Sequence, residues 1–239
     1  MKFGIANVAD VIAERPPLPL KDADDDSSCG TVSVTLQDEC DKFTQEFVSV
    51  VDEATLILVK DFVENLKGTK VADGARKEAQ SAPDFELPDQ YGNMVKLSDL
   101  LKAGPVVLSF HRGSWCPYCS LEITALQRYY EKIKARGATV VAISPMTLEK
   151  TLEMTEEYKA EGVELPSFPL LSDAGNQVAK QYGLTFTMDE TAHGWFKSLG
   201  GDLPAFNGDD SWTLPIPATY LVLPMERRIS FAMVDVDYT

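Results

Sequence analysis

The sequence predicts an α/β fold, because apolar strand segments and helices alternate along most of the chain. Residues 105–110 and 139–144 are short, apolar and rich in β-branched side chains, as in strands buried on both faces. Between them, residues 117–136 carry apolar side chains at helical spacing. Residues 218–223 and 228–234 predict two further strands joined by a turn. These observations indicate a central mixed sheet flanked by helices.

The other elements follow from the same patterns of hydrophobicity and turn residues. A hairpin is expected around the turn at 90–93, and a short helix is expected between Ser98 and Gly104. The remaining predictions are a helix over 147–161, a strand over 168–171, a helix over 176–182, and irregular chain over 190–215 with a short helix near 192–198.

A helical arm is predicted ahead of this domain. Over residues 35–67 apolar side chains recur every three or four positions, which fits one helix or two, and Gly68 is a suitable end. Prolines and an acidic run make residues 1–33 a flexible leader. The expected organisation is a leader at 1–33, an arm and linker at 34–80, and one α/β domain at 81–239.

The charge excludes some classes of partner. The 239 residues carry a formal net charge of -15, and such a surface repels phosphate backbones and anionic lipid headgroups. No apolar run reaches the roughly 18 residues that a membrane span needs. The first twenty residues lack the continuous apolar stretch of a secretory signal. We therefore expect a cytoplasmic protein that binds neither nucleic acid nor membranes.

Two of the four cysteines form the motif Cys116-Pro-Tyr-Cys119 between a predicted strand and a long helix. Pro117 suits the first helical turn, so Cys116 lies at the helix N-terminus, where backbone N–H groups and the helix dipole favour a thiolate. Arg112 and His111 add positive potential. Cys119 lies one turn further on, close enough for a reversible disulfide. This pattern predicts thiol redox chemistry.

Two structural explanations of the motif compete with redox chemistry. A C-x-x-C is also half of a zinc site, but the other candidates, Cys29, Cys40, His111 and His193, form no second pair at metal spacing. Two core cysteines would be expected in the middle of a helix rather than at a strand–turn–helix junction. We therefore expect no metal and no cofactor.

Pro217, just before a predicted strand, is a second signal. A proline in that position could be an ordinary trans residue at a strand entrance, which base rates favour. A cis Ile216–Pro217 bond would instead place a backbone edge beside the cysteines, where a substrate thiol could dock.

At this point the chain resembles the alkyl hydroperoxide reductase/thiol-specific antioxidant family of peroxiredoxin-like proteins, from about Ala82 to the end. It is most similar to the subgroup with an R-G-x-W-C-P-Y-C motif and an N-terminal helical arm. The resemblance implies a thioredoxin-like fold and peroxide or disulfide reduction, and it favours the cis form at Pro217. It rests on the segments Ala82-Pro-Asp-Phe-Glu-Leu-Pro-Asp, Arg112-Gly-Ser-Trp-Cys-Pro-Tyr-Cys, Ala142-Ile-Ser-Pro, Pro169-Leu-Leu-Ser-Asp and Pro217-Ala-Thr-Tyr.

The departures from the family leave the attacking cysteine open. If Cys119 occupies the peroxidatic position, Arg112 and Cys116 stand where a typical member has Pro and Thr, and Pro217 stands near where it has Arg. The position at the helix N-terminus favours Cys116, and the family alignment favours Cys119. Relatives also continue past Asp237, and thioredoxin folds usually end with a helix that covers one face of the sheet. Either the N-terminal helices cover that face here, or an apolar surface is exposed.

Other residues receive weaker predictions. Cys40 lies on the apolar stripe of the arm and is expected to pack there. Cys29 is expected to be a spare exposed thiol. Trp115 should shape the rim of the site and bind substrate together with Pro217. Trp212 could line the same cleft or anchor a loop, and His193 has no visible partner.

Three functions are compatible with these features. The first is a thiol peroxidase, in which Cys116, Cys119 and Arg112 reduce a hydroperoxide and a thioredoxin-like or glutathione-type reductant restores the thiols. The second is an oxidoreductase that acts on protein disulfides. The third is a non-enzymatic redox-sensing or interaction module. A homodimer is compatible with each of them.

Overall fold

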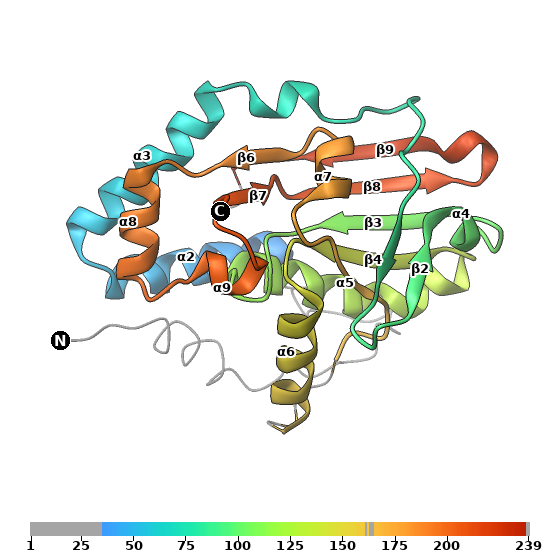
Figure 1. Cartoon of the computed structure of the whole chain (residues 1–239), viewed down its shortest axis with the longest axis horizontal. Coiled ribbons are helices and arrows are strands. Elements are labelled where there is room, and N and C mark those ends of the chain that lie inside the picture. The colour runs from blue at the N-terminus through green and yellow to red at the C-terminus, as the bar shows by residue number, and fades with distance from the viewer. Residues whose placement is uncertain (1–34, 161, 163–164, 238–239) are drawn as a thin grey trace, which may run out of the picture.

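A computed structural model describes residues 35–237 except 161, 163 and 164, so the predictions for the leader and for Cys29 lie outside the described residues. A five-stranded sheet of order β5-β4-β3-β8-β9 forms the centre (Figure 1). Strand β3 is parallel to β4 and antiparallel to β8. This mixed sheet with flanking helices confirms the predicted thioredoxin-like α/β fold. The sheet strands are β3 (Val106–Phe110), β4 (Thr139–Ser144), β5 (Leu170–Ser172), β8 (Ala218–Leu223) and β9 (Arg228–Val234).

The two faces of the sheet are covered by different elements. Because side chains alternate along a strand, Val106, Leu108 and Phe110 all enter the larger core on one face. That face is covered by the hairpin of β1 (Glu86–Pro88) and β2 (Met94–Lys96), and by α4 (Leu97–Leu100) and α7 (Gln177–Gln181). On the other face, α5 (Pro117–Ala135) packs Ile123, Leu126 and Ile133 against β4. Helix α6 (Leu148–Ala160) follows β4. The hairpin, the buried strands and these helices agree with the sequence prediction.

The arm consists of two helices, α2 (Leu36–Val50) and α3 (Glu53–Gly68). Thr35 and Asp38 form a capping box at the start of α2. Asp52 accepts a hydrogen bond from the backbone of Thr55, so the second helix starts there and the long apolar pattern is divided in two. Helix α2 packs on α5 and α3 packs on α8 (Glu190–Ser198). A 3₁₀ turn, η1 (Val71–Gly74), follows α3.

The prediction for residues 190–215 is partly wrong. The short helix is present as α8, but α9 (Leu203–Asn207) follows, and β7 (Thr213–Pro215) pairs with β6 (Thr185–Thr187) in a second, antiparallel sheet. These elements enclose a second core that also takes Leu66 from the arm. Each strand has only three residues, and its partner lies beyond two helices, so local patterning could not reveal the pairing. The buried members of this core are Leu66, Phe186, Met188, Ala192, Phe196, Leu203, Trp212, Leu214 and Ile216.

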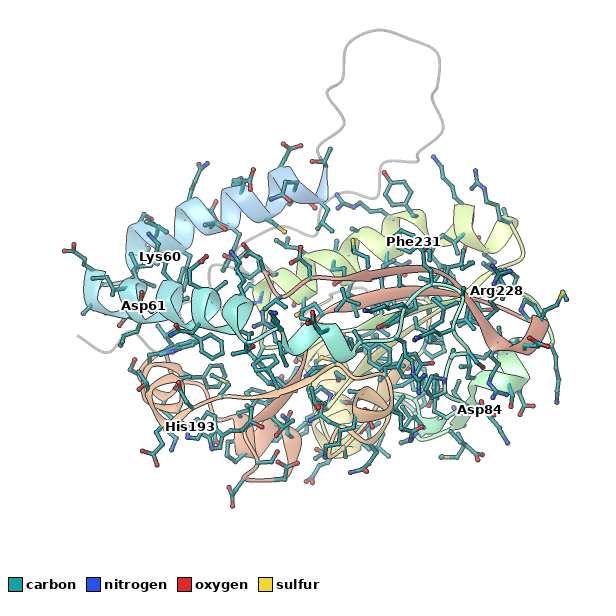
Figure 2. The ribbon with its side chains drawn as sticks, turned by 90° about the horizontal axis from the view of Figure 1, so that it is seen from above. Lys60, Asp61, Asp84, His193, Arg228 and Phe231 are labelled. Atoms are coloured by element: carbon teal, nitrogen blue, oxygen red, sulfur yellow. The ribbon has the colours of Figure 1, made fainter. Side chains whose placement is uncertain are left out.

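The described residues leave the outer part of the α5 face uncovered at β8 and β9. The strands pair Val107 with Leu221 and Leu221 with Phe231, so Phe231 lies on the same face as α5 (Figure 2). Phe231 is 47% exposed and Met233 is 53% exposed. The sequence allowed two alternatives for this face, coverage by the N-terminal helices or an exposed apolar surface. The described residues show the exposed apolar surface, and α2 of the arm packs on α5 instead. A 3₁₀ turn, η2 (Met225–Arg227), joins β8 to β9. No helix among the described residues is both long and apolar enough to cross a bilayer.

Candidate active site

The redox motif lies where β3 ends and α5 begins. Pro117 occupies the first helical turn and Cys116 is the N-cap residue, as predicted. The backbone N–H of Cys119 donates a hydrogen bond to the sulfur of Cys116, with 3.4 Å between the two atoms. The sulfur of Cys116 therefore fills the role that a Ser or Asp oxygen has at most helix starts, and a thiolate fills it best.

Arg112 completes the environment of Cys116. Its Nη2 donates to the Cys116 sulfur across 3.0 Å. Burial by itself raises the pKa of this thiol, but a hydrogen bond from Cys119 and the nearby guanidinium of Arg112 lower it to about 6. Cys116 is therefore a thiolate at neutral pH.

Cys119 behaves in the opposite way. Burial, the hydrogen bond that it gives to Cys116 and the repulsion of the Cys116 thiolate raise the pKa of the Cys119 thiol well above its ordinary value. The pair thus holds one proton on Cys119 and one negative charge on Cys116. Only 1% of Cys116 and 3% of Cys119 are exposed, so a reacting molecule must enter a closed site.

The loop before Cys116 is tightly packed. Gly113 has φ +131°, and a Cβ there would lie 2.7 Å from Nε1 of Trp115 and 3.2 Å from Cγ of Met146. The sulfur of Met146 in turn accepts a hydrogen bond from the backbone N–H of Ser114 (3.3 Å). Burial lowers the pKa of His111 to about 4, so this side chain is neutral and adds no positive charge to the site. This differs from the positive potential expected of His111.

Trp115 connects the motif to the second core. Its ring lies against Phe196 with centroids 4.9 Å apart, and the guanidinium of Arg112 lies 5.8 Å from its ring centroid. The indole therefore helps to hold Arg112 and forms one wall of the site. The predicted role of Trp115 in binding substrate at the rim of the site stays a prediction.

Pro217 lies near the motif but not in the predicted conformation. Phe110, the last residue of β3, pairs with Ala218. Pro217 is the residue before Ala218, so it lies beside the end of β3, where the redox loop starts. The expectation of a cis Ile216–Pro217 bond is wrong, because the described residues contain no cis peptide. The Pro217 carbonyl accepts from the backbone of Asp235 across 3.3 Å, so the trans form extends the pairing of β8 with β9.

Several polar contacts around the motif were not predicted. Glu122, three residues after Cys119, accepts hydrogen bonds from the hydroxyls of Ser109 (3.1 Å) and Thr219 (3.0 Å), and burial raises the pKa of its carboxyl. It thereby ties α5 to two strands of the sheet. Its spacing from Cys119 was the available signal, because residues at i and i+3 share a helix face.

The weaker predictions have clear outcomes. Cys40 is half-buried, as expected of a packed side chain. Trp212 is an anchor of the second core rather than a cleft residue, since its ring stacks on His193 with centroids 3.9 Å apart. His193 also contacts the carbonyl of Met188 across 2.9 Å, so it does have a partner. Among the described residues, no three His, Cys, Asp or Glu side chains gather as a metal site requires.

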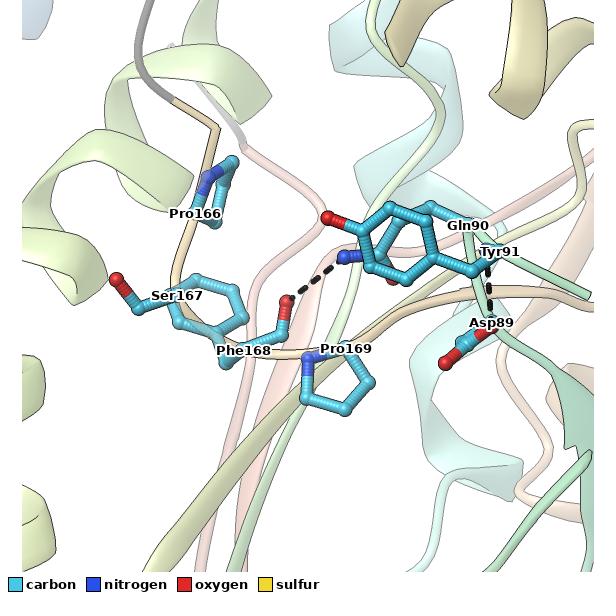
Figure 3. Close-up of a pocket in the computed structure, with 7 residues that line it drawn as sticks. All are labelled: Asp89, Gln90, Tyr91, Pro166, Ser167, Phe168 and Pro169. Atoms are coloured by element: carbon cyan, nitrogen blue, oxygen red, sulfur yellow. Dashed lines mark hydrogen bonds between the residues drawn. The ribbon is translucent and has the colours of Figure 1, made fainter. Parts of the chain in front are cut away.

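A shallow cavity of about 220 Å³ lies elsewhere, between Asp89–Tyr91 and Pro166–Pro169 (Figure 3). The side chain of Gln90 crosses it, accepting from the backbone of Leu170 and donating to the carbonyl of Phe168. The cavity precedes β5, whereas the thiols follow β3, and the two strands run the same way. It therefore lies at the opposite end of the sheet from the thiols.

The chain is similar to proteins named as peroxiredoxins. It is 37% identical over 115 residues to peroxiredoxin Q, chloroplastic, of Oryza sativa subsp. japonica, which covers 48% of this chain and 50% of that protein. It is 35% identical over 108 residues to putative peroxiredoxin Rv1608c of Mycobacterium tuberculosis, covering 45% of this chain and 66% of the relative. The match thus spans about half the length of the plant relative.

The chain is also similar to solved structures of peroxiredoxins. The crystal structure of peroxidoxin BcpB from Mycobacterium tuberculosis superposes with a TM-score of 0.51 and 26% identity, over 66% of this chain and 85% of that one. Peroxiredoxin 6 of Arenicola marina, at 18% identity, shares the fold with a TM-score of 0.52, over 67% of this chain and 66% of that one. The model of the AhpC/TSA family matches residues 79–227, more than half of the chain. The chain therefore belongs to the AhpC/TSA family.

Proposed function

We propose that this protein is a thiol-dependent peroxidase that reduces hydrogen peroxide or organic hydroperoxides, with Cys116 as the attacking thiolate. The observation that carries the proposal is the closed site in which Arg112 and the backbone of Cys119 both donate to the Cys116 sulfur. The peroxiredoxin names of the relatives support the same activity.

The geometry supports a three-step cycle. The Cys116 thiolate attacks one peroxide oxygen, so that an S–O bond forms and the O–O bond breaks, and the departing oxygen takes a proton from water. Arg112 stabilises the negative charge that moves onto that oxygen. The Cys119 sulfur then attacks the Cys116 sulfenic acid, and hydroxide leaves with the Cys119 proton as water. An external dithiol reduces the resulting disulfide and becomes a disulfide itself.

Burial of both sulfurs favours this reading over reduction of protein disulfides. A small peroxide can enter a closed site, whereas a folded protein cannot reach a sulfur that is 1% exposed unless the loop opens. The reductant, a thioredoxin-like dithiol or glutathione, must use such an opening later in the cycle. Its identity, the cytoplasmic location and a homodimer stay predictions.

Parallel assays test the activity. Consumption of hydrogen peroxide and cumene hydroperoxide is followed with thioredoxin and its reductase, and separately with glutathione, beside reduction of insulin disulfides. We expect peroxide turnover that Cys116→Ser abolishes. Insulin reduction without peroxide turnover would instead establish the protein-disulfide activity. If neither peroxide turnover nor insulin reduction is seen, the remaining function is the non-enzymatic redox-sensing or interaction module.

Mass spectrometry tests which sulfur attacks. The Cys119→Ser variant, treated with one equivalent of hydrogen peroxide and trapped with dimedone, should carry the label on Cys116. The Cys116→Ser variant should react far more slowly. Rapid labelling of Cys119 in that variant would overturn the assignment and identify Cys119 as the attacking cysteine, as the family alignment favours.

A further inference from the structure

Helix α2 of the arm is attached to α5 by an ion pair between a buried carboxylate and a half-buried guanidinium. Glu39, which is 6% exposed, accepts two hydrogen bonds from the guanidinium of Arg128, at 2.8 Å and 2.5 Å. A carboxylate is buried at this depth only when a partner satisfies it, and a two-point contact fixes the orientation as well as the distance. The pair therefore helps to set how α2 lies on α5.

One turn along α2, two side chains contact the redox motif itself. Tyr118 lies between the two cysteines in sequence, and the ring of Phe43 meets its ring edge-on with centroids 5.1 Å apart. The hydroxyl oxygens of Thr44 and Tyr118 are 2.9 Å apart. Thr44 uses its single proton on the carbonyl of Cys40, so Tyr118 is the donor and Thr44 the acceptor of this bond.

This contact bears on the thiolate through the backbone. Tyr118 belongs to the first turn of α5, and the next residue, Cys119, supplies the N–H that donates to the Cys116 sulfur. Holding the Tyr118 side chain therefore holds the turn that presents this donor. The arm also lies within electrostatic range of the site, because burial raises the pKa of Cys40 and the charges of Glu39 and Cys116 add to that rise.

We propose that Glu39, Phe43 and Thr44 of the arm are positioning residues of the redox centre, which fix Tyr118 and so keep the first turn of α5 in the geometry that stabilises the Cys116 thiolate. The inference rests on the proposed function only for its effect on turnover. Its effects on the thiol pKa and on the Cys116–Cys119 disulfide equilibrium can be measured without any peroxidase activity.

A double-mutant cycle tests the Thr44–Tyr118 bond. Thr44→Val and Tyr118→Phe each delete this hydrogen bond with little change of shape, and Thr44→Val also removes the bond to the carbonyl of Cys40, a loss that the Thr124→Val control reproduces on α5. We expect each to raise the pKa of Cys116, measured by thiolate ultraviolet absorbance, and to make the disulfide about two- to tenfold easier to form, the range that one hydrogen bond commonly changes an equilibrium. The double variant should match either single variant rather than their sum.

Matched controls separate positioning from plain stability. Thr124→Val removes an exposed hydroxyl on α5 that bonds to the carbonyl of Ser120, and it should change neither quantity. Loss of the Glu39 charge in Glu39→Gln by itself favours the Cys116 thiolate, so a rise of the Cys116 pKa in this variant measures lost positioning; the exchanged pair Glu39→Arg with Arg128→Glu should recover part of that rise. Three other titratable or charged residues lie near Cys116, and every variant retains them, so they cause no difference in its pKa between variants. They are Arg112, Cys119 and Cys40.

The result that overturns the inference is also defined. If Thr44→Val and Tyr118→Phe remain folded by circular dichroism but leave the pKa of Cys116 and the disulfide equilibrium unchanged, the arm is structural only. If instead these two quantities shift while the wild-type protein turns over no peroxide, the inference stands and the proposed function fails.

Discussion

Nη2 of Arg112 and the sulfur of Cys116 lie 3.0 Å apart, and the guanidinium lies against the ring of Trp115. This relationship predicts that Arg112→Met raises the pKa of Cys116, because the variant loses both the positive charge and the donor. Each unit by which the pKa rises above neutrality lowers the thiolate fraction about tenfold, and the peroxide reaction should slow accordingly. Stopped-flow peroxide reduction measures the rate, and Arg136→Met at the far end of α5 is the control. An unchanged rate in Arg112→Met would contradict the role of the guanidinium.

The pH dependence of the peroxide reaction should follow Cys116. Its pKa is lowered to about 6, so the reactive thiolate is present above that pH and is lost as the pH falls through it. His111, with a pKa of about 4, stays neutral across this range and contributes no inflection near 6. Single-turnover rates between pH 4 and pH 9 give the profile. Because Cys119 donates a hydrogen bond to the thiolate, Cys119→Ala should move the midpoint upward; a midpoint that stays in place would exclude that bond as a cause.

Gly113 cannot be replaced without a cost. At φ +131°, a side chain is strained, and its Cβ would press on Trp115 and Met146. Gly113→Ala should lower the free energy of unfolding by about 1–3 kcal/mol, as overpacking typically does, and should slow the peroxide reaction. Urea unfolding measures the first effect. Gly68→Ala at the end of α3 meets no atom within 4 Å and is the matched control, expected to be neutral or slightly stabilising.

The sheet should depend on Leu108, which is fully buried in the middle of β3. Leu108→Ala leaves a cavity and should destabilise the protein by about 2–5 kcal/mol. Met225, 82% exposed in the turn between β8 and β9, provides the comparison, and Met225→Ala should stay within about 0.5 kcal/mol of wild type. Equal losses of stability for both variants would show that β3 is not the centre of the core.

Some parts of the structure can be predicted from the sequence and others cannot, for a physical reason. The sequence predicts the placement of Cys116 and Cys119 because their arrangement is local: a buried strand, a proline in the first turn and a helix determine it. The contact of Thr44 with Tyr118 joins residues 74 positions apart, and nothing in either segment marks the other. The trans bond at Pro217 was missed for another reason, since the family resemblance favoured cis while the pairing of this chain favours an extended trans segment.

The second core extends beyond the part of the chain that the family model matches. Leu66 and Phe62 precede the segment that matches the family, yet both pack among Phe186, Trp195 and their neighbours. A fragment restricted to 79–227 would lose the contacts that Phe62 and Leu66 make with those aromatic rings. The segment that the family model matches is therefore shorter than the stretch of chain that encloses the second core.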